Sequence, residues 1–254
     1  MGYDHQRIKS NARLFYKNNT GNSILSILIF FGMIVAIGMA LRIFITIFSF
    51  IFVFAGRATA YSDAGTAVVS FMTSIVFIAG GLAMAAVEFP LIIGLMGWYR
   101  SSIYRQTSLG DILTPYKPPQ LWSNIGTGVL ITVFTYLWTL LFIIPGIIKA
   151  LSYSQALYIK GENPNISASR AIELSKIMMN GHKWDIFYLQ LSFIGWNILS
   201  SLTFGILGIV YVFPYYYAAH AFAYEEIKAD AAARGVIDIR EINPNFYSGE
   251  IYPQ

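Results

Sequence analysis

The sequence predicts an all-α protein: a polytopic membrane helix bundle of about six transmembrane helices, arranged as three hairpins, with interfacial amphipathic helices beside them. Three observations support this fold class. The 254 residues are 56% hydrophobic and only 12% charged, whereas soluble domains carry about 25% charged residues. Apolar runs recur along the chain, and several could cross a hydrocarbon core about 30 Å thick. Lysine and arginine lie mostly beside these runs, as is typical of segments that flank membrane spans.

Residues 3–18 are polar and basic, and their apolar side chains recur at helical spacing (Ile8, Ala12, Phe15 and Tyr16). The pattern predicts a short helix in the headgroup layer, with its apolar face toward lipid. The alternative is a cytoplasmic tail whose charges only set the topology. The first apolar run starts at Ile24 and is about 30 residues long, too long for the h-region of a signal peptide, so we expect it to stay as a span.

The first predicted hairpin consists of residues 24–55 and 67–98, joined by a polar turn at 56–65. Arg42 lies far along the first of these spans, near the outer interface, where a long side chain can extend toward the headgroups. Glu88 lies within the second span. An ionisable side chain at bilayer depth is costly unless it is paired or hydrated, so Glu88 and Arg42 are both candidate ligand-binding or buried-charge residues.

The second predicted hairpin consists of spans 121–144 and 146–160, which reverse direction near Pro145-Gly146. A loop at 101–120 precedes it, and the Pro118-Pro119 pair in that loop stops regular structure. A reading with only four spans would instead make 121–159 and 186–224 one bent helix each.

An amphipathic elbow helix is predicted over residues 166–180. Ser167 is a suitable N-cap, and Gly181 can close the C-terminus in a left-handed conformation. Its apolar face should lie flat on the membrane or under the bundle. The last two spans are predicted at 185–203 and 206–226. Residues 1–228 would then form a single transmembrane bundle, followed by a cytoplasmic tail at 229–254.

A weak internal repeat links the three return segments. Each contains a proline after a hydrophobic residue (Pro90, Pro145 and Pro214) and then runs to an aromatic residue at a charged boundary (Arg100, Lys160 and Glu225). Three hairpins, each with a proline-broken second helix, would account for it, because proline removes a backbone hydrogen bond and kinks a helix. The alternative is that prolines are simply common in membrane helices.

The basic residues predict the orientation. With six spans, all of the 17 lysines and arginines except Arg42, Arg57 and Lys149 lie on one side of the membrane. The positive-inside rule places that side in the cytoplasm, together with both termini. Four spans would export the basic residues of the 160–183 segment, so we favour six. The predicted location is the cytoplasmic membrane.

Lys149 and Glu88 lie at similar predicted depth, about 17 Å from the cytoplasmic boundary at helical rise. The sequence therefore suggests that they form a buried pair. One reading is a salt bridge that fixes how two hairpins dock. The other is a pair of charges in a polar intramembrane cavity that contact a lipid phosphate, an ion or a proton. His220, on an apolar helix, is a further candidate for this cavity or a packing residue.

The segment Gly181-His182-Lys183-Trp184-Asp185 has two readings. His182 and Lys183 could bind a lipid headgroup, or the segment could be a basic and aromatic entry to the membrane, with Asp185 capping the next helix. The three histidines have no metal-ligand spacing, and no nucleophile elbow or phosphate-binding loop is present. We therefore predict no metal, no cofactor and no catalytic residue.

From Pro145 onward the chain resembles the bacterial membrane family called domain of unknown function 975. The matching residues are Pro145-Gly146, Lys149-Ala150, Tyr153-Ser154, Glu162-Asn163-Pro164, Ser167-Ala168, Ala171-Ile172, Ser175, Met179, Gly181-His182-Lys183, Leu191 to Trp196, Leu202 to Ile206 and Pro214-Tyr215. The first 120 residues resemble the family only in hydropathy. The resemblance implies a multi-pass protein of the cytoplasmic membrane with no agreed activity. The layout is also distantly similar to the membrane domain of some glycerophosphodiester phosphodiesterases.

Three functional hypotheses follow. The leading one is a non-enzymatic membrane protein that binds a lipid or an amphipathic peptide, or handles its passage, through a polar cavity. The second is an accessory, scaffold or self-protection subunit that binds another membrane protein, and the third is an intramembrane enzyme. The expected partners are membrane lipids, an amphipathic peptide or another membrane protein. Nucleic acid is not an expected partner, because the basic residues do not form one stripe.

Overall fold

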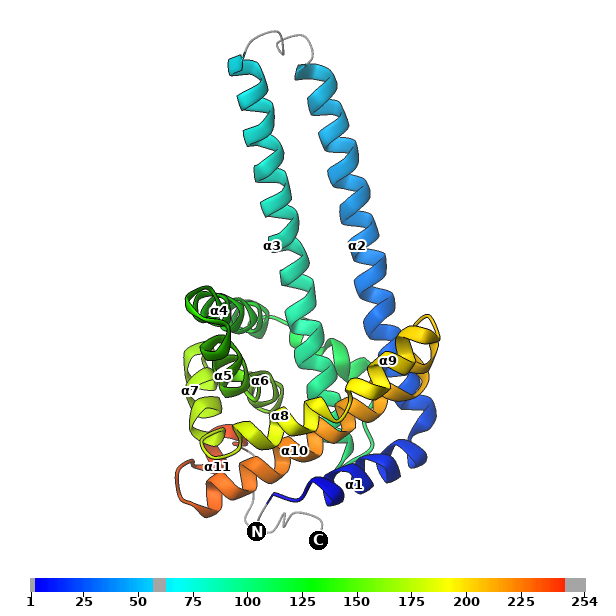
Figure 1. Cartoon of the computed structure of the whole chain (residues 1–254), viewed down its shortest axis with the longest axis vertical. Helices are drawn as coiled ribbons and strands as arrows, with labels where there is room; N and C mark the ends of the chain where they lie inside the picture. The colour runs from blue at the N-terminus through cyan, green and yellow to red at the C-terminus, as the bar shows by residue number, and fades with distance from the viewer. Residues whose placement is uncertain (1–2, 57–62, 245–254) are drawn as a thin grey trace. The chain divides into compact units, whose positions relative to one another are not determined.

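The computed structural model describes residues 3–56 and 63–244, and all regular elements within these ranges are helical (Figure 1). The elements are α1 (His5–Asn18), α2 (Thr20–Gly56), α3 (Asp63–Ser102), the 3₁₀ helix η1 (Leu109–Tyr116), α4 (Gln120–Leu141), α5 (Ile143–Tyr153), α6 (Ala156–Glu162), α7 (Ala168–Met178), α8 (Lys183–Leu191), α9 (Ile194–Leu202), the π-helix η2 (Gly208–Val212), α10 (Phe213–Ala233) and α11 (Ile239–Ile242). The predicted all-α class is confirmed. The predicted turn at 56–65 and the end of the tail lie largely outside the described residues.

Three helices in the described part of the chain are long and apolar enough to cross a membrane. They cover Thr20–Ile51, Ser70–Ser102 and Gln120–Leu141. Large apolar side chains remain exposed along them, for example Phe44, Phe50, Phe77, Leu82 and Leu140. A helix with apolar side chains on every face is typical of a membrane span. These segments correspond to predicted spans 24–55, 67–98 and 121–144.

Residues 29–88, which are most of α2 and of α3, form one compact unit of the chain. The second unit contains residues 1–28 and 89–254. It holds the shorter helices and the buried core, so the cavities and charge clusters below belong to it.

The fourth and fifth predicted spans are each divided into two helices. In place of 146–160 the chain forms α5 and α6, and in place of 185–203 it forms α8 and α9. The breaks fall beside Ser154 and Ser192, whose hydroxyls donate to the backbone carbonyls of Leu151 and Leu189. Serine readily makes such local bonds, which compete with regular helix bonding. Each of these two predicted segments is therefore helical with one break inside it.

The hypothesis of three proline-broken return helices does not hold for Pro145. Pro90 lies inside α3. Pro214 directly follows the π-helix η2, and Pro145 lies in the first turn of α5. The first N–H groups of a helix have no intrahelical acceptor, so a proline there costs no hydrogen bond. Pro145 therefore begins a helix, whereas Pro214 lies within the helical run 206–233 beside its π-helical turn.

α1 is the predicted N-terminal helix, but protein covers its apolar face. Ile8 and Ala12 are fully buried and Phe15 nearly so, and α1 lies along α10 (Figure 1). Arg7 of α1 forms an ion pair of 2.8 Å with Glu226 of α10. The expectation that this face contacts lipid was therefore wrong. A helical pattern shows which face is apolar, not what covers it.

α7 is the predicted elbow helix. Ser167 is its N-cap and accepts a hydrogen bond from the backbone N–H of Arg170, as predicted. Gly181 follows with a left-handed backbone, φ +97°. The apolar face of α7 is buried against α4, α5, α6 and α10, so the helix does not lie flat on lipid. The predicted tail also begins later, because α10 continues to Ala233.

α4 and α5 are separate helices that pack against each other. Phe142 lies between them in an extended conformation, so the alternative of one bent helix over 121–159 was wrong. Gly146 makes the contact possible. A Cβ atom at this position would lie 2.7 Å from the Cα atom of Thr139, closer than atoms can pack.

Candidate functional site

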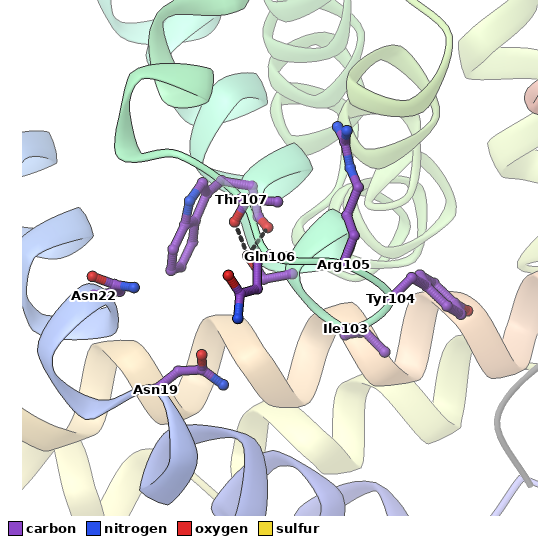
Figure 2. A pocket seen from close by; sticks show the side chains of 9 residues that line it. Asn19, Asn22, Ile103, Tyr104, Arg105, Gln106 and Thr107 are labelled. Atoms are coloured by element: carbon purple, nitrogen blue, oxygen red, sulfur yellow. Dashed lines mark hydrogen bonds between the residues drawn. The ribbon is translucent and has the colours of Figure 1, made fainter.

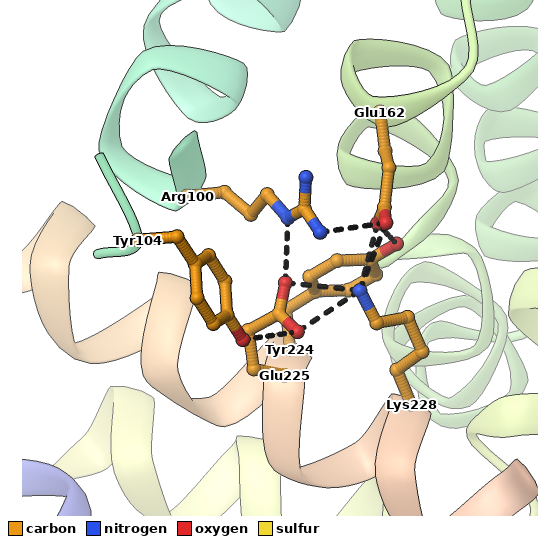
Figure 3. Close-up of polar contacts among 6 residues, drawn as sticks. All are labelled: Arg100, Tyr104, Glu162, Tyr224, Glu225 and Lys228. Carbon is orange, nitrogen blue, oxygen red and sulfur yellow. Dashed lines mark hydrogen bonds and ion pairs between the residues drawn. The ribbon is translucent and has the colours of Figure 1, made fainter. Parts of the chain in front are cut away.

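A buried network of charges connects α3, α6 and α10 (Figure 3). Arg100 near the end of α3 donates to Glu162 at 2.7 Å and to Glu225 at 2.6 Å. Lys228, one turn after Glu225, lies 2.9 Å from a carboxylate oxygen of each glutamate. The side chains of Glu162 and Lys228 are 1% and 2% exposed. Two cations and two carboxylates therefore balance each other in a place where an unpaired charge would be costly.

Two tyrosines complete the network. The hydroxyl of Tyr104 donates to Glu225 at 2.8 Å, and that of Tyr224 donates to Glu162 at 2.7 Å. Tyr158 stacks on Tyr224 with ring centroids 5.0 Å apart. Every charged group in the network thus has several partners. The arrangement fixes the end of α3 against α6 and α10, and it leaves no charge free for a ligand.

Two cavities adjoin this network. The smaller, of about 460 Å³, is drawn in Figure 2. It is lined by Asn19, Asn22, Trp98, Ser102, Ile103, Tyr104, Arg105, Gln106 and Thr107. The amide side chains of Asn19 and Gln106 lie on its walls in Figure 2. Its lining is mostly polar and belongs to the start of the chain and to the segment that follows α3.

The larger cavity, of about 520 Å³, lies between the end of α3 and the start of α4. Its lining residues are Ile93, Gly94, Gly97, Trp98, Ser101, Arg105, Thr107, Asp111, Thr114, Pro115, Lys117, Pro118, Gln120, Asn124, Lys160, Gly161 and Pro164. η1 closes one side. A Cβ atom at Gly94 would lie 1.8 Å from the carbonyl oxygen of Ile112, so glycine allows η1 to approach α3. Trp98, Arg105 and Thr107 line both cavities.

Two buried polar atoms beside the larger cavity have no hydrogen-bond partner in the described part of the chain. They are Nε1 of Trp98 and Oδ1 of Asn124. Trp98 is 3% exposed and Asn124 is 1% exposed. Buried polar groups are nearly always hydrogen-bonded in native proteins. Trp98 lines both cavities and Asn124 lines the larger one, so these two atoms are candidates for contact with a ligand or with ordered water there.

The charges that line the larger cavity are mainly positive. Arg105 and Lys117 are exposed, and Asp111 accepts a hydrogen bond from the backbone N–H of Ser108 at 3.2 Å. Lys160 is fully buried and donates to the hydroxyl of Ser123 and to the carbonyls of Pro164 and Ile166 at 2.7–2.9 Å. Its three protons are therefore used, so it contributes charge to the cavity but no free donor.

Neither cavity is lined by the residues that the sequence analysis proposed as ligand-binding or buried-charge candidates. Lys149 is half-buried, and its ammonium lies 4.6 Å from the ring centroid of Trp138. His220 is buried, with its ring 4.2 Å from that of Tyr216 and with Nε2 unpartnered among the described residues. Arg42 and Glu88 belong to the other unit. The pairing of Glu88 with Lys149 stays a prediction.

His182 lies in a small polar cluster on the surface. Its Nδ1 lies 2.9 Å from Asp185 and its Nε2 lies 2.9 Å from Asp230. The hydrogen bond from His182, followed by the charge of Arg234, lowers the pKa of Asp230. Lys183 is half-buried and begins α8. Predicting Asp185 as the helix cap was wrong, because His182 holds the cap position and Asp185 lies in the first turn.

Sequence reasoning missed the charge network and the larger cavity, although the repeat contained a signal. The boundary residues of the three return segments were Arg100, Lys160 and Glu225. The structure places Arg100 and Glu225 in the network and Lys160 at the cavity. Their equivalent positions in the repeat indicated that the three residues lie at a similar depth relative to the membrane. They did not indicate that Glu162 would join two of them.

The helices and the site define an all-helical protein with three segments able to cross a membrane. Residues 119–231 match the model of the family described as "Protein of unknown function (DUF975)". This confirms the predicted resemblance and extends it to the start of α4. No curated protein and no solved structure matches the chain. The more distant similarity to the phosphodiesterase membrane domain is not shown.

Proposed function

We propose that this chain is a non-enzymatic, multi-pass protein of the cytoplasmic membrane that binds a lipid in the larger cavity. The observation that carries the proposal is the position of that cavity. It lies between the last turns of one candidate span, α3, and the first turns of another, α4. Cavities with a few convergent polar groups are the usual binding sites of small ligands. At the end of two spans, the available ligand is the headgroup of a lipid.

Six crossings fit the helix lengths. α5 and α6 together cover residues 143–162, and α8 and α9 cover 183–202. Placed end to end, the helices of each pair would reach about 30 Å at about 1.5 Å per residue, which is the thickness of the hydrocarbon core. The breaks inside these pairs are compatible with a membrane where protein surrounds them, because buried backbone groups then find partners within the bundle.

Contacts between chain segments support the predicted sidedness. Lys160, at the end of the fourth predicted span, bonds to Ser123 at the start of the third. Arg100, at the end of the second, pairs with Glu225 at the end of the sixth. These contacts bring the ends of the three return segments close to the start of α4, and these four ends then lie on the same side of the membrane. The basic loops then lie together in the cytoplasm, as the positive-inside rule requires.

Filling the cavity tests the proposal. Thr114 lines the larger cavity from η1 and is exposed, so Thr114→Trp should occupy the space without disturbing the core. The matched control is Leu113→Trp, at the neighbouring exposed position that does not line the cavity. We expect native mass spectrometry from mixed-lipid nanodiscs to show one fewer retained phospholipid for Thr114→Trp than for the control. Equal retention by the two variants would refute the proposal.

A further inference from the structure

We infer that the larger cavity selects a lipid whose headgroup combines a phosphate with free hydroxyl groups, that is, a phosphoglycerol headgroup. This inference rests on the proposed function and deepens it, because it names the ligand chemistry of the same site. It follows from three properties of the lining: the sign of its charge, the type of its unsatisfied atoms and its position along the spans.

The charge of the lining selects an anion. Arg105 and Lys117 are exposed, and neither side chain has an ion pair or a hydrogen bond within the described ranges 3–56 and 63–244. The indole N–H of Trp98 adds a buried donor without a partner. Two free cations and a free N–H donor match the oxygens of a phosphate, since charge-assisted hydrogen bonds to phosphate are the strong ones.

The acceptors of the lining select hydroxyl donors. The amide Nδ2 of Asn124 already donates to the carbonyl of Pro115 at 2.8 Å, which fixes the orientation of the amide. The free atom is therefore the acceptor Oδ1. The carboxylate of Asp111 is a second acceptor on the lining. Acceptors require donors, and a headgroup that is also an anion can supply them as hydroxyls.

Other abundant headgroups fit less well. A phosphocholine has no hydrogen-bond donor for Asn124. A phosphoethanolamine offers donors, and its ammonium can pair with Asp111. Both headgroups are net neutral, however, whereas the lining carries Arg105, Lys117 and Lys160 against the one carboxylate of Asp111 and so favours a headgroup with a net negative charge. A diester phosphate without hydroxyls would satisfy the cations and leave Asn124 unpartnered. A phosphoglycerol satisfies both groups of lining residues, because its phosphate pairs with the cations and its hydroxyls donate to the acceptors.

The position of the cavity favours a lipid over a soluble phosphate. Trp98 lies in the last turns of α3, and tryptophan is enriched at the membrane–water interface. Ile93 and Gly97, on the apolar part of α3, also line the cavity. The exposed charges of the lining therefore lie on the connecting segment 103–119, and α3 adds an apolar surface against which the start of the acyl chains can pack.

The test measures headgroup preference. In nanodiscs with equal phosphatidylglycerol and phosphatidylcholine, we expect native mass spectrometry to show the glycerol lipid retained in about tenfold excess. Arg105→Gln with Lys117→Gln should abolish the excess. The control Lys17→Gln with Lys176→Gln removes two exposed basic residues away from the cavity and should keep it. Loss of preference in both double variants would show a general charge effect and overturn the inference.

Two further arms separate the alternatives. Phosphatidylethanol carries the same charge as phosphatidylglycerol but no hydroxyl, so retention of the two lipids in equal amounts would refute the role of Asn124 and Asp111. Millimolar glycerol phosphate should not displace the lipid, and displacement would show that the ligand is the free phosphate. If all lipids bind equally but Thr114→Trp still removes one, this inference fails while the proposed function stands.

Discussion

Arg100 is the residue on which the buried network depends. It is the cation that contacts both glutamates from α3, and without it Lys228 faces two carboxylates alone. Removing one partner of a buried ionic network typically costs about 3–5 kcal/mol, because it leaves an uncompensated charge. Arg100 therefore contributes far more than a surface arginine does.

We expect Arg100→Met to lower the free energy of unfolding by about 3 kcal/mol or more, measured by thermal unfolding in detergent. The control Arg7→Met breaks the ion pair with Glu226, where the arginine side chain is 44% exposed, and should cost no more than about 1 kcal/mol. Adding Glu225→Gln to Arg100→Met should restore part of the loss. Equal effects of the two single substitutions would contradict this account of the network.

At the scale of elements, the contact between α4 and α5 depends on Gly146. A methyl group there would lie 2.2 Å from Oγ1 of Thr139 and 2.7 Å from its Cα. The second of these atoms is backbone, so the helices must separate to accommodate it.

Gly146→Ala should therefore destabilise the protein by about 1–3 kcal/mol, as overpacked sites do, in the same unfolding assay. Gly126→Ala is the matched control in α4, because a Cβ atom there meets nothing within 4 Å. It should be neutral or stabilising by up to about 1 kcal/mol, since alanine favours helix more than glycine does. A neutral Gly146→Ala would show that the α4–α5 packing differs from that described.

The elements also show how far sequence reasoning reaches. The three long helices and the Ser167 cap were predictable, because hydropathy and capping are local properties. The lipid-facing role of α1 was not, because Ile8 and Ala12 form the same pattern whether lipid or α10 covers them. The candidate site depended on contacts such as those of Arg100 with Glu162 and Glu225, which join distant parts of the chain. Lys149 and His220 were notable for their charge within apolar runs, but neither lines the cavities described.

At the scale of the whole molecule, the membrane topology of the chain has to agree with the position of the proposed lipid site. Sparse charge and long apolar helices commit the chain to the membrane. The contacts of Lys160 with Ser123 and of Arg100 with Glu225 bring the basic segments to one level. A lipid headgroup can enter the larger cavity from the cytoplasmic leaflet only if the segment between α3 and α4 lies on the cytoplasmic side.

The topology can be measured directly, because the chain contains no cysteine and single cysteines can be placed without background. We expect a membrane-impermeant maleimide on intact cells to label Arg57→Cys, and to label Lys117→Cys and Lys176→Cys only after permeabilisation. That result would place both basic segments in the cytoplasm, on the side opposite residue 57. Labelling of positions 57 and 176 from the same side of the membrane would contradict the account.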